Sequence, residues 1–177
     1  MRIERTWEMP NKYTFALSSA RNLLLEEMSG EYVDPFAGMN SPAHITNDIN
    51  ADCPTTFHRD ATEFLESLQT NAFDGALFDP PYSAFQVVKS YGLRSDGEPR
   101  LEQLHSRCKD DLSRLVRPGG KVICFGWNSS GMGEKRGFLL QRVLLICHGG
   151  AHNDTIVTVE TKIQSSFDFG VDFEVRK

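Results

Sequence analysis

The 177-residue sequence lacks several features by which whole classes of protein are recognised. No apolar run reaches about 18 residues, so we expect no membrane span, and the charged N-terminal MRIERTWEMPNKY indicates no secretory signal. The four cysteines contain no CxxC pair, which fits free thiols in a reducing, cytoplasmic compartment. There is also no GxxxxGK[ST] phosphate loop, no internal repeat and no low-complexity linker. We therefore expect one soluble domain, residues 1–177, large enough to bury a core.

Charge is distributed unevenly although the net charge is only −5. Residues 1–82 carry 5 Lys/Arg against 13 Asp/Glu, whereas residues 83–150 carry 11 against 6. Residues 151–177 carry 3 against 5. A phosphate backbone could be held by the positive block while the acidic part binds something else. A solvated, helix-rich surface explains the charge pattern equally well.

Short apolar runs alternate with helical patterns up to residue 127. Alternation of this kind predicts βαβ units and a mostly parallel sheet flanked by helices. Two later runs, 138–149 and 154–162, flank GGAHND and predict an antiparallel C-terminal hairpin. The expected strands lie within 30–38, 43–50, 76–78 and 121–127, and the expected helices span 19–28, 60–69 and 98–116.

Polar or aromatic residues follow the expected strands. In open α/β sheets, ligands bind at the carboxyl ends of the strands. Four carboxylates on one sheet edge would repel each other unless a ligand bound there. The four carboxylates are those of Asp34, Asp48, Asp60 and Asp79, and the aromatic residue is Trp127.

The stretch Asp79-Pro80-Pro81-Tyr82 ends the third expected strand. Two prolines fix two φ angles and remove two N–H donors, so the turn is stiff and offers a carboxylate with free carbonyls. Such an acceptor-only pocket suits an exocyclic –NH₂, and Tyr82 adds a flat face for stacking a ring. Hydrogen bonds to Asp79 and a proline carbonyl would make the amino nitrogen more tetrahedral, so that it can attack an activated methyl group. A plain strand-ending turn is the alternative.

These residues and their neighbours resemble the amino-methyltransferases of nucleic acids, the N6-adenine/N4-cytosine class that uses S-adenosylmethionine. The resemblance covers roughly residues 12–128 and implies a Rossmann-like class I methyltransferase fold. DPPY at 79–82 matches the catalytic motif of that family. DPFAGMN at 34–40 is similar to the cofactor loop, with Asn40 in place of the usual last glycine.

The resemblance also implies roles for individual residues. Asp48 would bind the ribose hydroxyls of the cofactor, Asp60 would accept from its adenine amine with Ala61 alongside, and Thr14 and Phe15 would lie near its methionine end. The cofactor loop itself would contribute Asp34, Phe36 and Gly38.

Family members usually carry a target-recognition domain, and we expect no separate one within residues 1–177. We therefore expect nucleic acid contacts from the loops 89–100 and 128–137, both predicted to lie over the pocket, or help from a homodimer or a separate recognition subunit. The expected substrate contacts are Arg94, Arg100, Trp127, Lys135 and Arg136.

The family resemblance favours DNA adenine N6 as the target, in the cytoplasm of a prokaryotic or phage-infected cell. Cytosine N4, RNA, or a catalytically idle nucleic-acid-binding subunit remain alternatives. Cys147, His148 and His152 lack a second ligand pair, so we expect no metal site.

Overall fold

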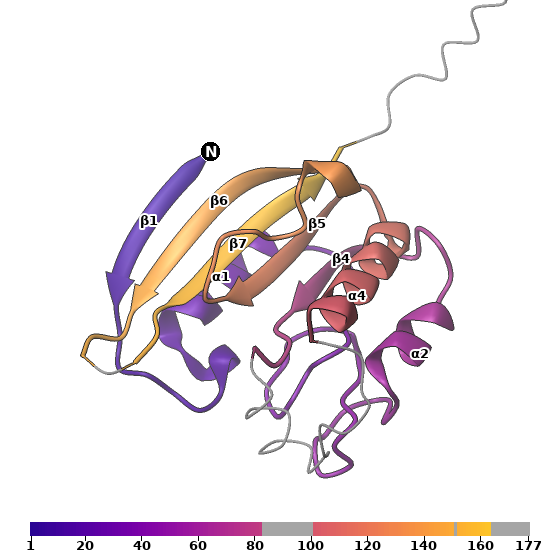
Figure 1. Cartoon of the computed structure of the whole chain (residues 1–177), viewed down its shortest axis with the longest axis horizontal. Helices are drawn as coiled ribbons and strands as arrows, with labels where there is room; N and C mark the ends of the chain where they lie inside the picture. Colours follow the sequence, from indigo (N-terminus) through magenta and orange to yellow (C-terminus); the bar gives the residue numbers. More distant parts are fainter. Residues whose placement is uncertain (83–100, 151, 164–177) are drawn as a thin grey trace, which may run out of the picture.

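The computed structural model describes residues 1–82, 101–150 and 152–163, and shows a single twisted sheet with helices on both faces (Figure 1). The elements, with η denoting a 3₁₀ helix, are β1 (Arg2–Trp7), η1 (Thr14–Ala16), α1 (Ser18–Glu27), β2 (Tyr32–Asp34), β3 (Ile45–Thr46), α2 (Ala61–Glu66), β4 (Phe73–Phe78), α4 (Leu101–Leu115), β5 (Val116–Gly126), η2 (Glu134–Arg136), β6 (Phe138–Cys147) and β7 (Thr155–Lys162).

The sheet has seven strands in the order β1-β6-β7-β5-β4-β2-β3. Every pairing is parallel except those of β7, which runs antiparallel to both β5 and β6. The predicted mostly parallel sheet with a C-terminal antiparallel hairpin is confirmed. Its strand order brings the carboxyl ends of β2, β4 and β5 to one edge, which is where the candidate site lies.

Two apolar clusters cover the two faces of the sheet. Helices α2 and α4 bury residues such as Phe64 and Leu112 against Val122 and Phe78. Helix α1 packs Leu23 and other residues on the opposite face. Helices therefore cover both faces of the sheet over its centre. Among the described residues, no helix is both long enough and apolar enough to cross a membrane.

Strand β1 was not predicted, because Arg2–Trp7 has no apolar run. The strand lies at the sheet edge, where it pairs with β6 alone and leaves Trp7 63% exposed. An edge strand with one unpartnered side tolerates charged residues. The segment after it also caps α1, since the Glu8 carboxylate accepts hydrogen bonds from the backbone N–H groups of Ser18 (2.7 Å) and Ser19 (2.9 Å).

Candidate active site

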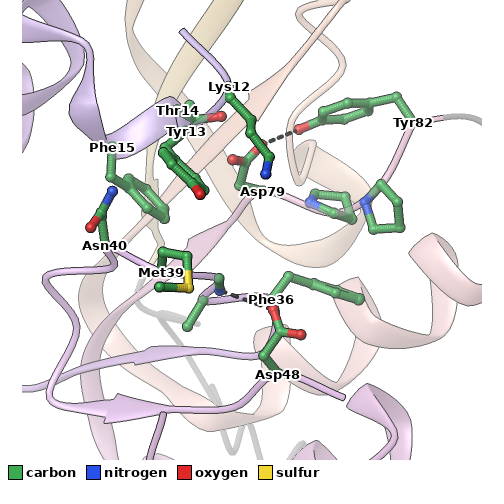
Figure 2. A pocket seen from close by; sticks show the side chains of 14 residues that line it. Lys12, Tyr13, Thr14, Phe15, Phe36, Met39, Asn40, Asp48, Asp79 and Tyr82 are labelled. Carbon is green, nitrogen blue, oxygen red and sulfur yellow. Dashed lines mark hydrogen bonds between the residues drawn. The ribbon is translucent and has the colours of Figure 1, made fainter. Parts of the chain in front are cut away.

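A cavity of about 210 Å³ opens at the carboxyl ends of β2 and β4 (Figure 2). It brings together segments that are far apart in the sequence. It lies between the N-terminal segment, the loop after β2 and the DPPY turn, so the space between the predicted cofactor loop and the predicted catalytic turn is open. The lining comprises 12–15, 36–40, Asp48 and 79–82.

The loop after β2 is shaped by the fully buried Asp34. One carboxylate oxygen accepts from the Phe36 N–H at 3.0 Å and the other from the Ser41 hydroxyl at 2.6 Å. Burial, with the nearby charges of Asp79 and Asp48, raises the pKa of Asp34 to about 7 despite these hydrogen bonds. Asp34 therefore folds the loop and is not among the residues that line the cavity.

Gly38 and Asp48 form the adjoining wall. Gly38 has φ +55°, and its N–H donates to Asp48 Oδ2 at 2.9 Å (Figure 2). The Asn50 N–H donates to Asp48 Oδ1 at 2.9 Å. Burial raises the pKa of Asp48 in spite of both donors. A Cβ atom on Gly38 would meet no protein atom within 4 Å, so this side of the turn is open to a ligand.

Asn47 holds these segments together, although no sequence motif marks it beyond its position next to Asp48. Its Nδ2 donates to the carbonyls of Pro35 (3.1 Å) and Arg59 (3.0 Å). Its Oδ1 accepts from the Arg59 N–H at 3.0 Å. The side chain is fully buried with its polar atoms paired, so it fixes the loop after β2 against the segment that leads into α2.

We expect Asn47→Asp to lower the free energy of unfolding by about 3 kcal/mol or more. The change keeps the shape of the side chain but removes both donors and buries a new negative charge beside Asp34 and Asp48. Urea unfolding at pH 7 measures the effect. Asn71→Asp, at an exposed position, is the control and should change stability by about 0.5 kcal/mol or less. Equal stability of the two variants would contradict the role given to Asn47.

In the DPPY turn, Asp79 is held by two hydroxyl groups. Tyr82 donates to Asp79 Oδ1 at 2.9 Å and also contacts the Phe125 carbonyl oxygen (Figure 2). The Thr14 hydroxyl hydrogen-bonds the same carboxylate. Burial raises the pKa of Asp79, and burial next to Asp79 raises that of Tyr82. Asp79 is therefore oriented before any substrate arrives.

Trp127, which follows β5, lies beside Tyr82. The two ring centroids are 5.4 Å apart with planes tilted by 36°, and Trp127 is 45% exposed. The pair offers an aromatic surface beside the turn.

One expectation about the turn is wrong. The Pro81 carbonyl is not free, because it lies 2.9 Å from Nε2 of His105 on α4. Among the described residues, the carbonyl of Pro80 accepts no hydrogen bond. The acceptors that the turn presents are therefore Asp79 and one proline carbonyl.

The N-terminal segment places more residues at the cavity than predicted. Thr14 and Phe15 line it, and so do Lys12 and Tyr13. The Lys12 ammonium lies 5.1 Å from the centroid of the Tyr13 ring. Lys12 thus brings a positive charge to a cavity whose walls carry Asp48 and Asp79. Lys12 and Tyr13 directly precede Thr14 and Phe15, to which the family resemblance assigns a place near the cofactor.

Asp60 and Ala61 lie at the start of α2 and are not among the lining residues. The Asp60 carboxylate accepts from the Thr62 N–H at 2.8 Å and the Glu63 N–H at 3.3 Å, which makes it the N-cap of the helix. Its side chain is engaged in a structural contact that is common for aspartate at this position.

The loop 128–137 does not lie over the cavity, which corrects the prediction for Lys135 and Arg136. Because β6 is parallel to β5, the chain must return to the amino edge of the sheet before β6 begins, and η2 lies there. Arg136 bonds Asp110 on α4 at 2.7 Å, whereas Lys135 is exposed. Arg94, Arg100 and the loop 89–100 lie outside the described residues.

The CHGGAHND segment has a structural use. His148 Nδ1 lies 2.8 Å from the Glu8 carbonyl, and Nε2 lies 2.9 Å from the Thr155 hydroxyl. Within the part of the chain that the structure describes, no group of three or more His, Cys, Asp or Glu side chains could hold a metal ion.

Solved structures share the fold at low identity. No protein-family model and no curated protein sequence matches the chain. TrmN from Thermus thermophilus superposes with a TM-score of 0.54 and 17% identity, over 80% of this chain and 46% of TrmN. This chain therefore spans less than half the length of TrmN.

Two further structures match this chain over a larger share of their own length. One is a 1,6-didemethyltoxoflavin-N1-methyltransferase from Burkholderia thailandensis with bound S-adenosylhomocysteine (TM-score 0.54, 13% identity, 83% of this chain and 76% of the enzyme). The other is the N-methyltransferase NodS from Bradyrhizobium japonicum (TM-score 0.51, 9% identity, 81% and 92%). At these identities the likeness establishes the Rossmann-like methyltransferase fold.

Proposed function

We propose that this chain is an S-adenosylmethionine-dependent methyltransferase that acts on the exocyclic amine of a nucleobase, adenine N6 in DNA. One observation carries the proposal: the DPPY turn and the loop after β2 face each other across one open cavity. A methyl donor and an amine acceptor must meet within such a space for direct transfer. The fold shared with two N-methyltransferases supports the same conclusion.

The residues on the loop side fit the cofactor. Asp48 presents a carboxylate at the cavity wall, and a carboxylate can accept hydrogen bonds from both hydroxyls of a ribose. The open space beside Gly38 lets a ligand approach the backbone closely. A cationic ligand would also relieve the repulsion between Asp34 and Asp48. Asp60, which caps α2, is a weaker candidate for contact with the cofactor.

The residues of the turn fit the amine. S-Adenosylmethionine, when bound, supplies an electrophilic methyl group on a positively charged sulfur. We expect Asp79 and the Pro80 carbonyl to accept the two N–H groups of the amine, which draws the nitrogen lone pair out of the ring for bonding to the methyl carbon. Asp79 is also the carboxylate placed to accept the proton that the nitrogen must then lose. Tyr82 and Trp127 would stack the base, which has to leave a duplex to reach them.

The experiment that tests this function identifies the modified base. Purified protein is incubated with S-adenosylmethionine and, separately, with single-stranded DNA, duplex DNA and RNA, and each product is digested to nucleosides for mass detection. We expect N6-methyldeoxyadenosine from DNA. N4-methyldeoxycytidine would reassign the substrate to cytosine, and methylated RNA would reassign it to RNA. Unmodified nucleosides from all three nucleic acids would contradict the proposal.

Asp48→Ala should weaken S-adenosylmethionine binding by about 1.5–3 kcal/mol, the contribution of hydrogen bonds to a charged group. Titration calorimetry measures the affinity, and thermal unfolding shows separately whether the variant is folded. Asp52→Ala, at an exposed position of the same loop, is the matched control and should bind as the wild type does. An unchanged affinity in Asp48→Ala would remove Asp48 from the cofactor site.

A further inference from the structure

We propose that His105 is the positioning residue of the DPPY turn, which it holds at the required place by donating a hydrogen bond to the Pro81 carbonyl. No sequence motif marks His105, which the helical pattern of 98–116 leaves outside its apolar stripe. This inference rests on the proposed function, because the turn that His105 holds is the one that would bind the substrate amine.

The turn receives a donor from another element. Pro80 and Pro81 have no N–H group, so neither residue can anchor the turn through its own backbone donor. The Pro81 carbonyl is an acceptor, and His105 Nε2 on α4 lies 2.9 Å from that oxygen. This hydrogen bond connects α4 directly to the DPPY turn at Pro81.

The imidazole ring also packs on both sides of the turn. Its centroid lies 6.0 Å from that of Phe78, at the end of β4, with planes at 85°. It lies 6.4 Å from that of Tyr82, with planes at 70°. Edge-to-face contacts at these separations are favourable. His105 therefore packs against Phe78 and Tyr82, which flank Asp79-Pro80-Pro81, and hydrogen-bonds the last of these three residues.

The protonation of His105 suits this role. Burial lowers its pKa, with a further contribution from Lys109 one turn along the helix. The neutral ring carries its single proton on the nitrogen that faces the Pro81 carbonyl, because a carbonyl oxygen can only accept. The site thereby gains a hydrogen-bond donor without adding a second positive charge to that of Lys12.

Helix α4 is a rigid base for this contact. Cys108 and Leu112 are fully buried in the core against the sheet. At the far end of the helix, Arg114 donates to the Leu65 carbonyl at 2.9 Å and to the Leu68 carbonyl at 2.8 Å. A residue on such an element can hold a neighbouring turn more accurately than one on a loop.

Two variants separate the hydrogen bond from the ring packing. His105→Phe keeps an aromatic ring and removes the donor, whereas His105→Gln keeps an N–H donor and removes the ring. We expect His105→Phe to lower kcat for methyl transfer by about 10- to 100-fold, the cost of a misplaced reacting group. Its KM and Kd for S-adenosylmethionine should stay unchanged, since His105 is not among the residues that line the cavity. His105→Gln should recover most of the rate.

Gln103→Ala, at an exposed position on the same helix, is the control and should act as the wild type does. A His105→Phe variant with wild-type kcat would overturn the inference, as would equal losses in kcat and in cofactor affinity, which indicate a general structural role.

A second measurement does not depend on activity. Nitrogen-15 NMR of the wild-type protein without cofactor should show His105 protonated at Nε2, and a ring protonated at Nδ1 would overturn the hydrogen bond. If the wild-type protein shows the Nε2–H signal but transfers no methyl group, the hydrogen bond is present and the proposed function is contradicted. The role of His105 in catalysis is then contradicted as well.

Discussion

Asp79→Asn is expected to reduce methyl transfer by about 100- to 1,000-fold while leaving the affinity for S-adenosylmethionine unchanged. Asparagine has nearly the same shape and can still accept from the Tyr82 hydroxyl, which bonds Asp79 Oδ1 at 2.9 Å. It loses the negative charge, however, and replaces one acceptor by an NH₂ group that repels the N–H groups of the substrate amine. Losses of this size are typical when one preorganised electrostatic group is removed.

The role of Asp79 also predicts that the methyl-transfer rate of the wild-type protein depends on pH. Burial raises the pKa of Asp79, so the carboxylate is protonated at a higher pH than an ordinary aspartate. Activity should therefore fall on acidification sooner than an exposed carboxylate would require. Single-turnover rates between pH 5 and 8 measure the decline. Asp110→Asn, on the exposed side of α4, is the control and should keep the wild-type rate and profile.

Retained activity in Asp79→Asn would exclude the carboxylate from the mechanism. A parallel loss of cofactor affinity would assign Asp79 to cofactor binding.

Asp34→Asn is expected to make the protein more stable at pH 8, by up to about 4 kcal/mol. Burial and the nearby Asp79 and Asp48 raise the pKa of Asp34 to about 7, against 3.8 for an ordinary aspartate. Between these values the folded protein keeps a proton that the unfolded chain has released, so the wild type loses stability as the pH rises from about 4 to about 7. Each pH unit in this window corresponds to about 1.4 kcal/mol.

The asparagine side chain can preserve both hydrogen bonds of Asp34. Its oxygen can accept from the Phe36 N–H, and its NH₂ group can donate to the Ser41 hydroxyl, which can rotate to accept. Urea unfolding of both proteins at pH 5, 6, 7 and 8 tests the expectation. The two stability curves should separate as the pH rises, and parallel curves would show that folding does not raise the pKa of Asp34.

Much of the candidate site could be predicted because its residues follow strands. Asp34, Asp48 and Asp79 lie at or just past the ends of short strands, and a parallel sheet places such strand ends on one edge. Stiff turn chemistry in DPPY and the glycine at 38 carried further local information. Such features belong to the chain itself and need no knowledge of packing.

The remaining features depend on contacts between distant elements. Strand β1 is charged and forms only because β6 offers a free edge, so local pattern could not reveal it. Asn47 and His105 act through carbonyl groups of other segments, which have no sequence signature. Lys135 and Arg136 were misplaced because the antiparallel strand β7 inserts between β5 and β6 and sends the connecting loop to the opposite edge.

Titration calorimetry of the wild-type protein with S-adenosylmethionine tests the central claim most directly, since the claim is that the cavity between Gly38 and Asp79 holds a methyl donor. The account predicts binding of one molecule per chain, weakened in Asp48→Ala and unchanged in Asp79→Asn. No measurable heat of binding from the folded wild-type protein, or an affinity that Asp48→Ala leaves intact, would contradict it.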